Sequence, residues 1–172
     1  MKKIIFFAAI AMVAFTTNAV AQSTADATAS TSATVITPIK ITKDVDMNFG
    51  NLVATADGGP IVLPTTGART GDAAILLGTQ NGTVAAASFT VTGETGFTYA
   101  ITLPAASFDV KNSDTTPATM AVGTFVSSPD ATGTLTSGTE TLKVGATITL
   151  LADQASGDYT NTTDMIVTVF YN

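Results

Sequence analysis

The sequence contains no cysteine, no histidine and no tryptophan among its 172 residues. Without cysteine no disulfide can form, so the folded chain must be stabilised by its core and by backbone hydrogen bonds. The lack of histidine, cysteine and any obvious carboxylate cluster excludes most metal sites and most pairs of nucleophile and base. We therefore predict that the protein is not an enzyme, and that it has no catalytic, cofactor-binding or metal-binding residue.

Basic residues are also scarce. Lys and Arg together number 7 against 13 Asp and Glu, and two of the seven lie in an N-terminal segment that we expect to be removed, which changes the net charge from −6 to −8. A protein that binds nucleic acid needs a basic surface, so this class of partner is excluded. We interpret the remaining lysines as solubilising charges at strand edges and turns: Lys40, Lys43, Lys111 and Lys143.

The N-terminus has the pattern of a secretory signal peptide over residues 1–21. Two lysines precede a short apolar run, and Ala19 and Ala21 provide the small residues that flank a cleavage site before Gln22. The apolar run is shorter than the roughly 20 residues that a membrane-spanning helix needs. No cysteine stands at the cleavage site to carry a lipid anchor. We expect an exported protein of the periplasm, cell surface or extracellular space, with no membrane span after cleavage.

The rest of the chain alternates apolar and polar residues between closely spaced turns, with no helical period. This pattern predicts an all-β protein, an immunoglobulin-like antiparallel β-sandwich that forms one domain over residues 37–172. We expect strands near 24–36, 38–43, 46–54, 60–63, 72–78, 84–93, 96–103, 106–110, 118–127, 140–152 and 164–172.

Two stretches define the expected core most clearly. One is the hairpin around residues 88–104, in which large apolar residues alternate with threonines, and the other is residues 141–151. One face of each strand should therefore be buried and the other solvated. The residues predicted to face inward are Phe97, Tyr99, Ile101, Leu103, Leu142, Val144, Ile148 and Leu150.

Residues 164–172 carry large apolar groups on both faces. Met165, Val167, Val169 and Tyr171 share one parity, and Ile166 and Phe170 share the other. A strand this apolar is an aggregation hazard if it is left unpaired. We therefore predict a central strand, laid against residues 141–151 or against the N-terminal segment.

Residues 22–36 alternate in a different way, because the less polar parity carries mostly small residues: Ala25, Ala27, Ala29, Thr31, Ala33 and Val35. Three interpretations remain open. The segment is a poorly ordered mature N-terminus, or the first strand of its own sandwich, or a donor strand that completes the sheet of a neighbouring subunit. Its small side chains favour the first two over deep interlocking between subunits.

Three polar motifs suggest ligand or modification sites. Asp44, Asp46 and Asn48 recur at every second position before Gly50, which approaches a calcium loop, but the spacing of the glycine and of the final acidic residue is wrong. A solvated strand face explains these residues better. Asn81-Gly82-Thr83 and Asn161-Thr162-Thr163 fit the glycosylation sequon, and we interpret both as ordinary turn residues.

Three stretches of the chain carry a resemblance to a known family. They are "ATVITPIKIT" followed by "MNFGNLVA", the long segment from Gly133 to Asn172, and the signal peptide with small alternating residues behind it. With these motifs the chain resembles domain of unknown function family 4402, small exported β proteins of Gram-negative bacteria.

The closing pattern, Gly157-x-Tyr159 followed by Val167 to Tyr171, also looks like that of spore-coat-U-type and other chaperone–usher pilin subunits. This resemblance implies an immunoglobulin-like sandwich whose last strand is held by a periplasmic chaperone. The sandwich is then completed by an N-terminal strand from the next subunit. Unlike many of those subunits, this chain has no cysteine pair.

We therefore expect an exported, non-enzymatic structural protein, a surface or fimbria-like subunit that acts by β-strand pairing. Its expected partners are other copies of itself or a periplasmic chaperone, bound by strand addition. The rival expectation is a self-contained binding module of the periplasm or cell surface that binds glycan or protein through its loops. The two expectations differ in whether residues 23–36 pair within their own chain.

Overall fold

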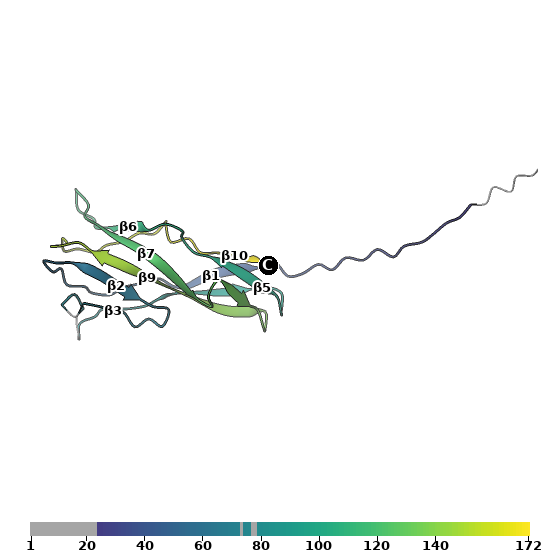
Figure 1. Cartoon of the computed structure of the whole chain (residues 1–172), viewed down its shortest axis with the longest axis horizontal. Coiled ribbons are helices and arrows are strands. Elements are labelled where there is room, and N and C mark those ends of the chain that lie inside the picture. Colours follow the sequence, from purple (N-terminus) through teal and green to yellow (C-terminus); the bar gives the residue numbers. More distant parts are fainter. Residues whose placement is uncertain (1–23, 73, 77–78) are drawn as a thin grey trace, which may run out of the picture. The chain divides into compact units, whose positions relative to one another are not determined.

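The computed structural model describes residues 24–72, 74–76 and 79–172, and it is built from β-strands (Figure 1). The expected signal peptide, residues 1–21, lies outside this part of the chain. Within the described part, no helix is long and apolar enough to cross a membrane. The contacts separate the chain after Thr34, and the strands all belong to the unit Val35–Asn172.

Two antiparallel sheets make up this unit. One has seven strands, in which β1, β4, β9, β2 and β3 are each hydrogen-bonded to the next and β6 and β7 are joined to it through β9, and the other has three, in the order β10, β5, β8. The fold is therefore the predicted immunoglobulin-like antiparallel β-sandwich. The strands are β1 (Lys40–Val45), β2 (Gly59–Leu63), β3 (Thr70–Gly71), β4 (Ala87–Thr92), β5 (Thr98–Thr102), β6 (Phe108–Lys111), β7 (Thr119–Ser128), β8 (Thr132–Thr134), β9 (Thr139–Leu150) and β10 (Thr168–Tyr171).

The long strand β9 organises the larger sheet, and Figure 1 shows it beside β7 and β2. Its first half pairs with β4 and its second half with β2, while β7 pairs along the other edge. The ladder between β7 and β9 is interrupted between Gly123 and Val126, where Thr124 has a φ of 51°. Such a bulge bends the strand and increases its twist, so one sheet can cover two parts of the core.

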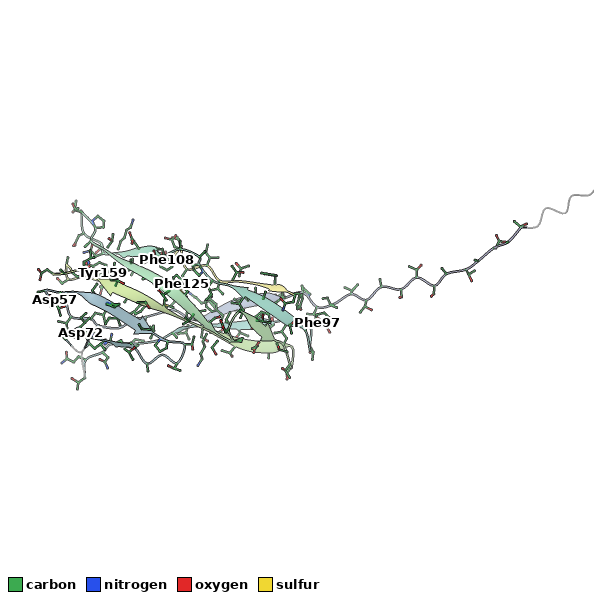
Figure 2. The ribbon with its side chains drawn as sticks, in the orientation of Figure 1. Asp57, Asp72, Phe97, Phe108, Phe125 and Tyr159 are labelled. Atoms are coloured by element: carbon green, nitrogen blue, oxygen red, sulfur yellow. The ribbon has the colours of Figure 1, made fainter. Side chains whose placement is uncertain are left out.

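The core consists of two clusters that follow β9. Near its start, β9 packs with β4 and β5, and near its end with β2, β7 and the buried Ile75. Met47 and Phe125 pack against both clusters and so connect them. Figure 2 shows Phe125 beside Phe108, and the two rings stack with centroids 5.5 Å apart.

The predicted faces of the strands are largely confirmed. Tyr99 and the four predicted residues of β9 are buried, and Ile101 and Leu103 are partly buried within the same cluster. Phe97 was placed wrongly, because 41% of it is exposed. Its N–H donates to the Glu94 carbonyl in a turn, so the residue precedes β5 and does not follow the alternation of the strand.

Three expected strands are wrong. Residues 24–36 lie in no strand. Residues 46–54 form only isolated bridges, because the Asn48 side chain accepts a hydrogen bond from the Gly50 N–H (2.7 Å) and Gly50 adopts a φ of 69°. In the expected strand 72–78, of which the structure describes residues 72 and 74–76, Asp72 instead accepts hydrogen bonds from the N–H groups of Ala74, Ile75 and Leu76, which makes a turn.

The connection between β9 and β10 is fixed by a tyrosine. The Tyr159 hydroxyl donates to the Ala155 carbonyl (2.6 Å) and accepts from the side-chain amide of Gln154 (2.8 Å). Gln154 is buried, and its amide nitrogen also donates to the Thr119 carbonyl (3.2 Å). This is the arrangement of the tyrosine corner of immunoglobulin-type sandwiches, which fixes the path into the strand that follows.

Candidate strand-pairing edge

Strand β10 lies at the end of the smaller sheet. It pairs with β5 in the register Thr168 to Thr102 and Tyr171 to Tyr99, and in the described part of the chain no strand pairs with its other edge. The prediction of a central strand against residues 141–151 or the N-terminal segment is therefore wrong. Alternation fixes which face of a strand is buried, but it does not choose the partner strand, so β5 could not be found in this way.

The free edge of β10 presents unpaired backbone groups. Asn172 donates its N–H to the Thr98 carbonyl (3.3 Å), which places the even-numbered residues on the β5 side of the ladder. In an antiparallel ladder successive residues point their N–H and C=O groups to opposite edges. Val169 and Tyr171 therefore direct theirs to the open edge, where an added strand could bond to them.

The edges of the larger sheet are protected. Edge strand β1 carries Lys40 and Lys43, and its ladder with β4 is irregular after Lys43. Edge strand β6 carries Asp109 and Lys111, and the backbone of Lys111 exchanges two hydrogen bonds with Thr160. Charges, bulges and covering segments are the devices by which proteins prevent further strand addition.

The edge of β10 has no protecting charge, and its ladder with β5 is regular. Residues 165–171 contain no charged side chain. The other edge strands, β3 and β8, have only two and three residues, and so offer short templates. Judged by charge, regularity and length, β10 is the edge strand of the described residues to which another strand could most easily be added.

The side chains of β10 and the residues before it also leave apolar surface open. Met165, Val167 and Val169 pack against the core cluster of β4, β5 and the start of β9 but are only partly buried. On the opposite face, Ile166 is 65% exposed and Phe170 is 51% exposed. The predicted division of faces is therefore confirmed, and burial of the inward face is incomplete along this edge.

The last residue of β10 also holds the chain just before β1. The Tyr171 hydroxyl donates to the Thr37 carbonyl (2.7 Å) and accepts from the Glu94 N–H (2.6 Å). The Glu94 carboxylate accepts from the Thr37 N–H (2.8 Å), and this bond lowers the pKa of Glu94. We call this three-residue contact, Tyr171 with Glu94 and Thr37, the clasp.

Residues 24–34 form a separate unit and belong to no helix or strand. All their side chains are exposed. Alanine recurs at every second position from Ala25 to Ala33, except at Thr31, and serine, threonine and aspartate fill the positions between them. The segment thus has the period of a strand without a strand partner in the described chain.

The other sequence candidates are parts of the fold. Asp46 pairs with Lys43 (2.6 Å) just after β1, and Asp44 accepts a hydrogen bond from Thr90, so both carboxylates have local partners. Among the described residues, no group of three or more His, Cys, Asp or Glu side chains could hold a metal ion.

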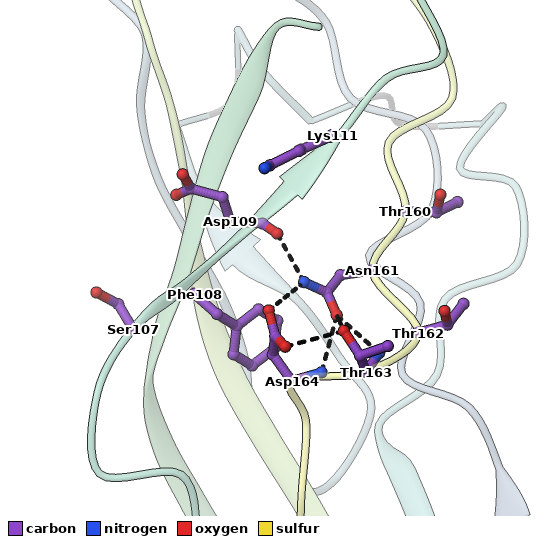
Figure 3. A pocket seen from close by; sticks show the side chains of 9 residues that line it. All are labelled: Ser107, Phe108, Asp109, Lys111, Thr160, Asn161, Thr162, Thr163 and Asp164. Atoms are coloured by element: carbon purple, nitrogen blue, oxygen red, sulfur yellow. Dashed lines mark hydrogen bonds between the residues drawn. The ribbon is translucent and has the colours of Figure 1, made fainter.

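Asn161 is the centre of a loop network, shown in Figure 3. Its amide nitrogen donates to the Asp109 carbonyl and to Asp164, both at 2.8 Å, and its oxygen accepts from the N–H groups of Thr163 and Asp164. The bonds from Asn161 and Thr163 lower the pKa of the Asp164 carboxyl. Polar residues that line an open hollow here are thus hydrogen-bonded to one another, and Asn161 serves as a turn residue.

Asn81 also has a structural role, in the loop between β3 and β4. Its carbonyl accepts from the Asn51 N–H (2.7 Å), and its side chain accepts from the Arg69 guanidinium (3.1 Å). Burial lowers the pKa of Arg69. Gly50 packs so closely here that a Cβ would lie 2.2 Å from the Asn81 carbonyl oxygen.

Comparison with protein families identifies the class to which this chain belongs. Residues 39–171 match the model of the family "Domain of unknown function (DUF4402)", so the chain is a member of that family. This match covers both sheets and the clasp residues Glu94 and Tyr171. No curated protein and no solved structure matches the chain.

Proposed function

We propose that the protein is an exported, non-enzymatic structural subunit of a surface or fimbria-like assembly, and that it acts by β-strand addition at the free edge of β10. The observation that carries this proposal is the combination of an uncharged edge strand with an alternating segment, residues 24–36, that lies in no strand. A donated strand would satisfy the open N–H and C=O groups and cover the inward apolar side chains.

The length of the segment supports this role. Thirteen residues in extended form span about 43 Å at about 3.3 Å per residue, several times the length of the four-residue strand β10. The alanine-rich parity would face the core and the polar parity would face solvent. The rival, a self-contained binding module, expects these residues to form the first strand of their own sandwich, and they lie in no strand.

Export rests on the sequence of residues 1–21, which has the three parts of a secretory signal. A periplasmic chaperone that holds β10 by strand addition would use the same edge before assembly. Intact-mass analysis of the exported protein tests the first point. A measured mass equal to that of residues 22–172 supports export, and a mass that includes residues 1–21 contradicts it.

Strand addition is tested with peptides of residues 24–36 labelled with a fluorophore and mixed with the mature chain. Two peptides carry N-methyl groups on alternate residues, one set on the odd and the other on the even positions. An added strand uses only one set of its N–H groups against β10. One methylated peptide should therefore bind like the unmodified peptide, and the other should bind at least about tenfold more weakly.

A matched pair of variants places the binding on β10. Val169→Pro removes an N–H at the open edge and leaves the ladder to β5 intact, because proline is tolerated at the solvent side of an edge strand. Val169→Ala keeps that N–H and removes side-chain volume. Loss of peptide binding in the proline variant alone supports backbone pairing at β10. Equal binding of both methylated peptides, or equal loss in both variants, would refute it.

A further inference from the structure

The clasp brings together three parts of the chain that are far apart in sequence. Thr37 lies just before β1, Glu94 in the turn after β4, and Tyr171 at the end of β10. Both backbone groups of Thr37 are bonded, its N–H to Glu94 and its C=O to Tyr171. Thr37 is thus held at the end of β10.

The tyrosine is itself held firmly. Its ring meets Phe97 edge to face with centroids 5.6 Å apart. A Cβ at position 93 would lie 2.2 Å from the Tyr171 hydroxyl oxygen, so Gly93 is required for this close approach. The hydroxyl uses its one proton for Thr37 and a lone pair for Glu94, which leaves no freedom to rotate without the loss of a bond.

The clasp also sets the direction in which the segment enters. Strand β1 begins at this end of the sandwich, whereas β10 terminates here. If residues 24–36 paired with β10 of their own molecule, the chain would therefore have to reverse direction between this segment and β1, immediately before Thr37. The reversal cannot occur at Thr37, because the clasp holds both its backbone groups and because Pro38 favours an extended conformation at the preceding residue.

The residues available for such a reversal are poorly suited to it. Val35 and Ile36 are β-branched, and Val35 is 95% exposed. Residues 33–36, directly before Thr37, contain no glycine, proline, asparagine, aspartate or serine, which are the main residues of tight turns. A donated strand from a second molecule meets no such requirement, because its own sandwich lies elsewhere.

We infer that the clasp is a specificity device, which directs residues 24–36 to the β10 edge of a second copy of this chain rather than to their own. This inference rests on the proposed strand addition. Tyr171, Glu94 and Thr37 are positioning residues in it. The contacts among them hold Thr37 in place and make self-pairing unfavourable, so that identical subunits join head to tail.

The variant Tyr171→Phe tests this role, because it keeps the ring that packs on Phe97 and removes only the hydroxyl. Glu94→Ala opens the clasp from the other side, and Glu94→Gln is the conservative control, since its amide oxygen can still accept from the Thr37 N–H. Ser30→Cys supplies one attachment point for a spin label in a chain that otherwise lacks cysteine. Broadening of β10 amide signals then reports where the segment lies.

Two samples separate the two modes of pairing. In a mixture of spin-labelled unenriched chains with unlabelled ¹⁵N chains, only pairing between molecules broadens β10. In a sample of ¹⁵N chains that carry the spin label, diluted so that molecules do not pair with one another, self-pairing broadens the β10 signals. We expect Tyr171→Phe and Glu94→Ala to shift the ratio of the two signals toward self-pairing by about tenfold, as expected for the loss of one or two hydrogen bonds, and Glu94→Gln to behave as the wild type.

Unchanged pairing between molecules in both Tyr171→Phe and Glu94→Ala would overturn the inference and leave the proposed function standing. Absence of β10 broadening in both samples of the wild type would instead refute the proposed function itself. Sedimentation velocity on the same samples checks the first result, because self-paired chains should be monomers at concentrations at which the wild type assembles.

Discussion

Replacement of Leu142 by alanine tests the core at its best-defined point. Leu142 lies on β9 with no exposed surface and belongs to the cluster that also contains Val91 and Tyr99. The change removes about three methylene equivalents at about 0.8 kcal/mol each, and a cavity term is added because a close-packed interior relaxes only partly. We expect a loss of about 3–5 kcal/mol in the free energy of unfolding.

Urea denaturation of the mature chain measures this loss, and the matched control is Thr149→Ala on the same strand. Thr149 faces solvent, so its truncation should cost less than about 0.5 kcal/mol. For a domain of this size the larger loss corresponds to a fall of roughly 6–20 °C in Tm, at about 2–4 °C per kcal/mol. Equal losses for the two variants would mean that the faces of β9 are assigned wrongly.

Two further changes test local contacts. Gly133→Ala on β8 should destabilise the fold by about 1–3 kcal/mol in urea denaturation, because its Cβ would lie 2.3 Å from the Tyr99 ring; an unchanged midpoint would contradict this close contact. Asn161→Ala should raise the pKa of Asp164, measured by NMR titration, because that carboxylate loses a hydrogen-bond donor. Because the pKa of Asp164 is lower in the folded than in the unfolded chain, the Asp164 carboxylate stabilises the fold at pH values above its unfolded pKa. This stabilisation is lost as the pH falls through the folded pKa. In the Asn161→Ala variant, the loss of stability at acid pH that is due to Asp164 should therefore be smaller.

The sequence predicted most of the strands because alternation is a local signal. The pattern from Thr139 to Leu150 places every second residue on one face, and the buried side chains of β9 follow that pattern. Turn residues such as Gly96 and Gly138 mark the ends of neighbouring strands, and both have positive φ. Strand existence and face were therefore accessible without the structure.

The features that escaped prediction depend on contacts between distant residues. Strand β8 has the sequence Thr-Gly-Thr, which indicates a turn, yet Gly133 lies in a strand because the Tyr99 ring occupies the space above it. The partner of β10 and the clasp at Tyr171 likewise depend on tertiary arrangement, and no local pattern specifies Glu94 or Thr37 as neighbours. For the candidate site, the sequence indicated the apolar strand at residues 164–172 and the alternating segment at residues 24–36. It did not indicate that β10 has an open edge to which such a segment could be added.

The small side chains of residues 24–36 determine what kind of assembly the open edge can support. An alanine-rich strand adds little apolar area, so backbone pairing must supply most of the affinity, and assembly should be reversible on dilution. Ala27→Val with Ala29→Val adds about four methylene equivalents on the parity that would face the core, which should slow dissociation by at least about tenfold where space allows. Thr28→Val, of similar size on the opposite parity, should leave the rate unchanged in a dilution experiment. If the Thr28 variant slowed dissociation equally, the segment would not pair with a defined inward face, and strand addition at β10 would lose its structural basis.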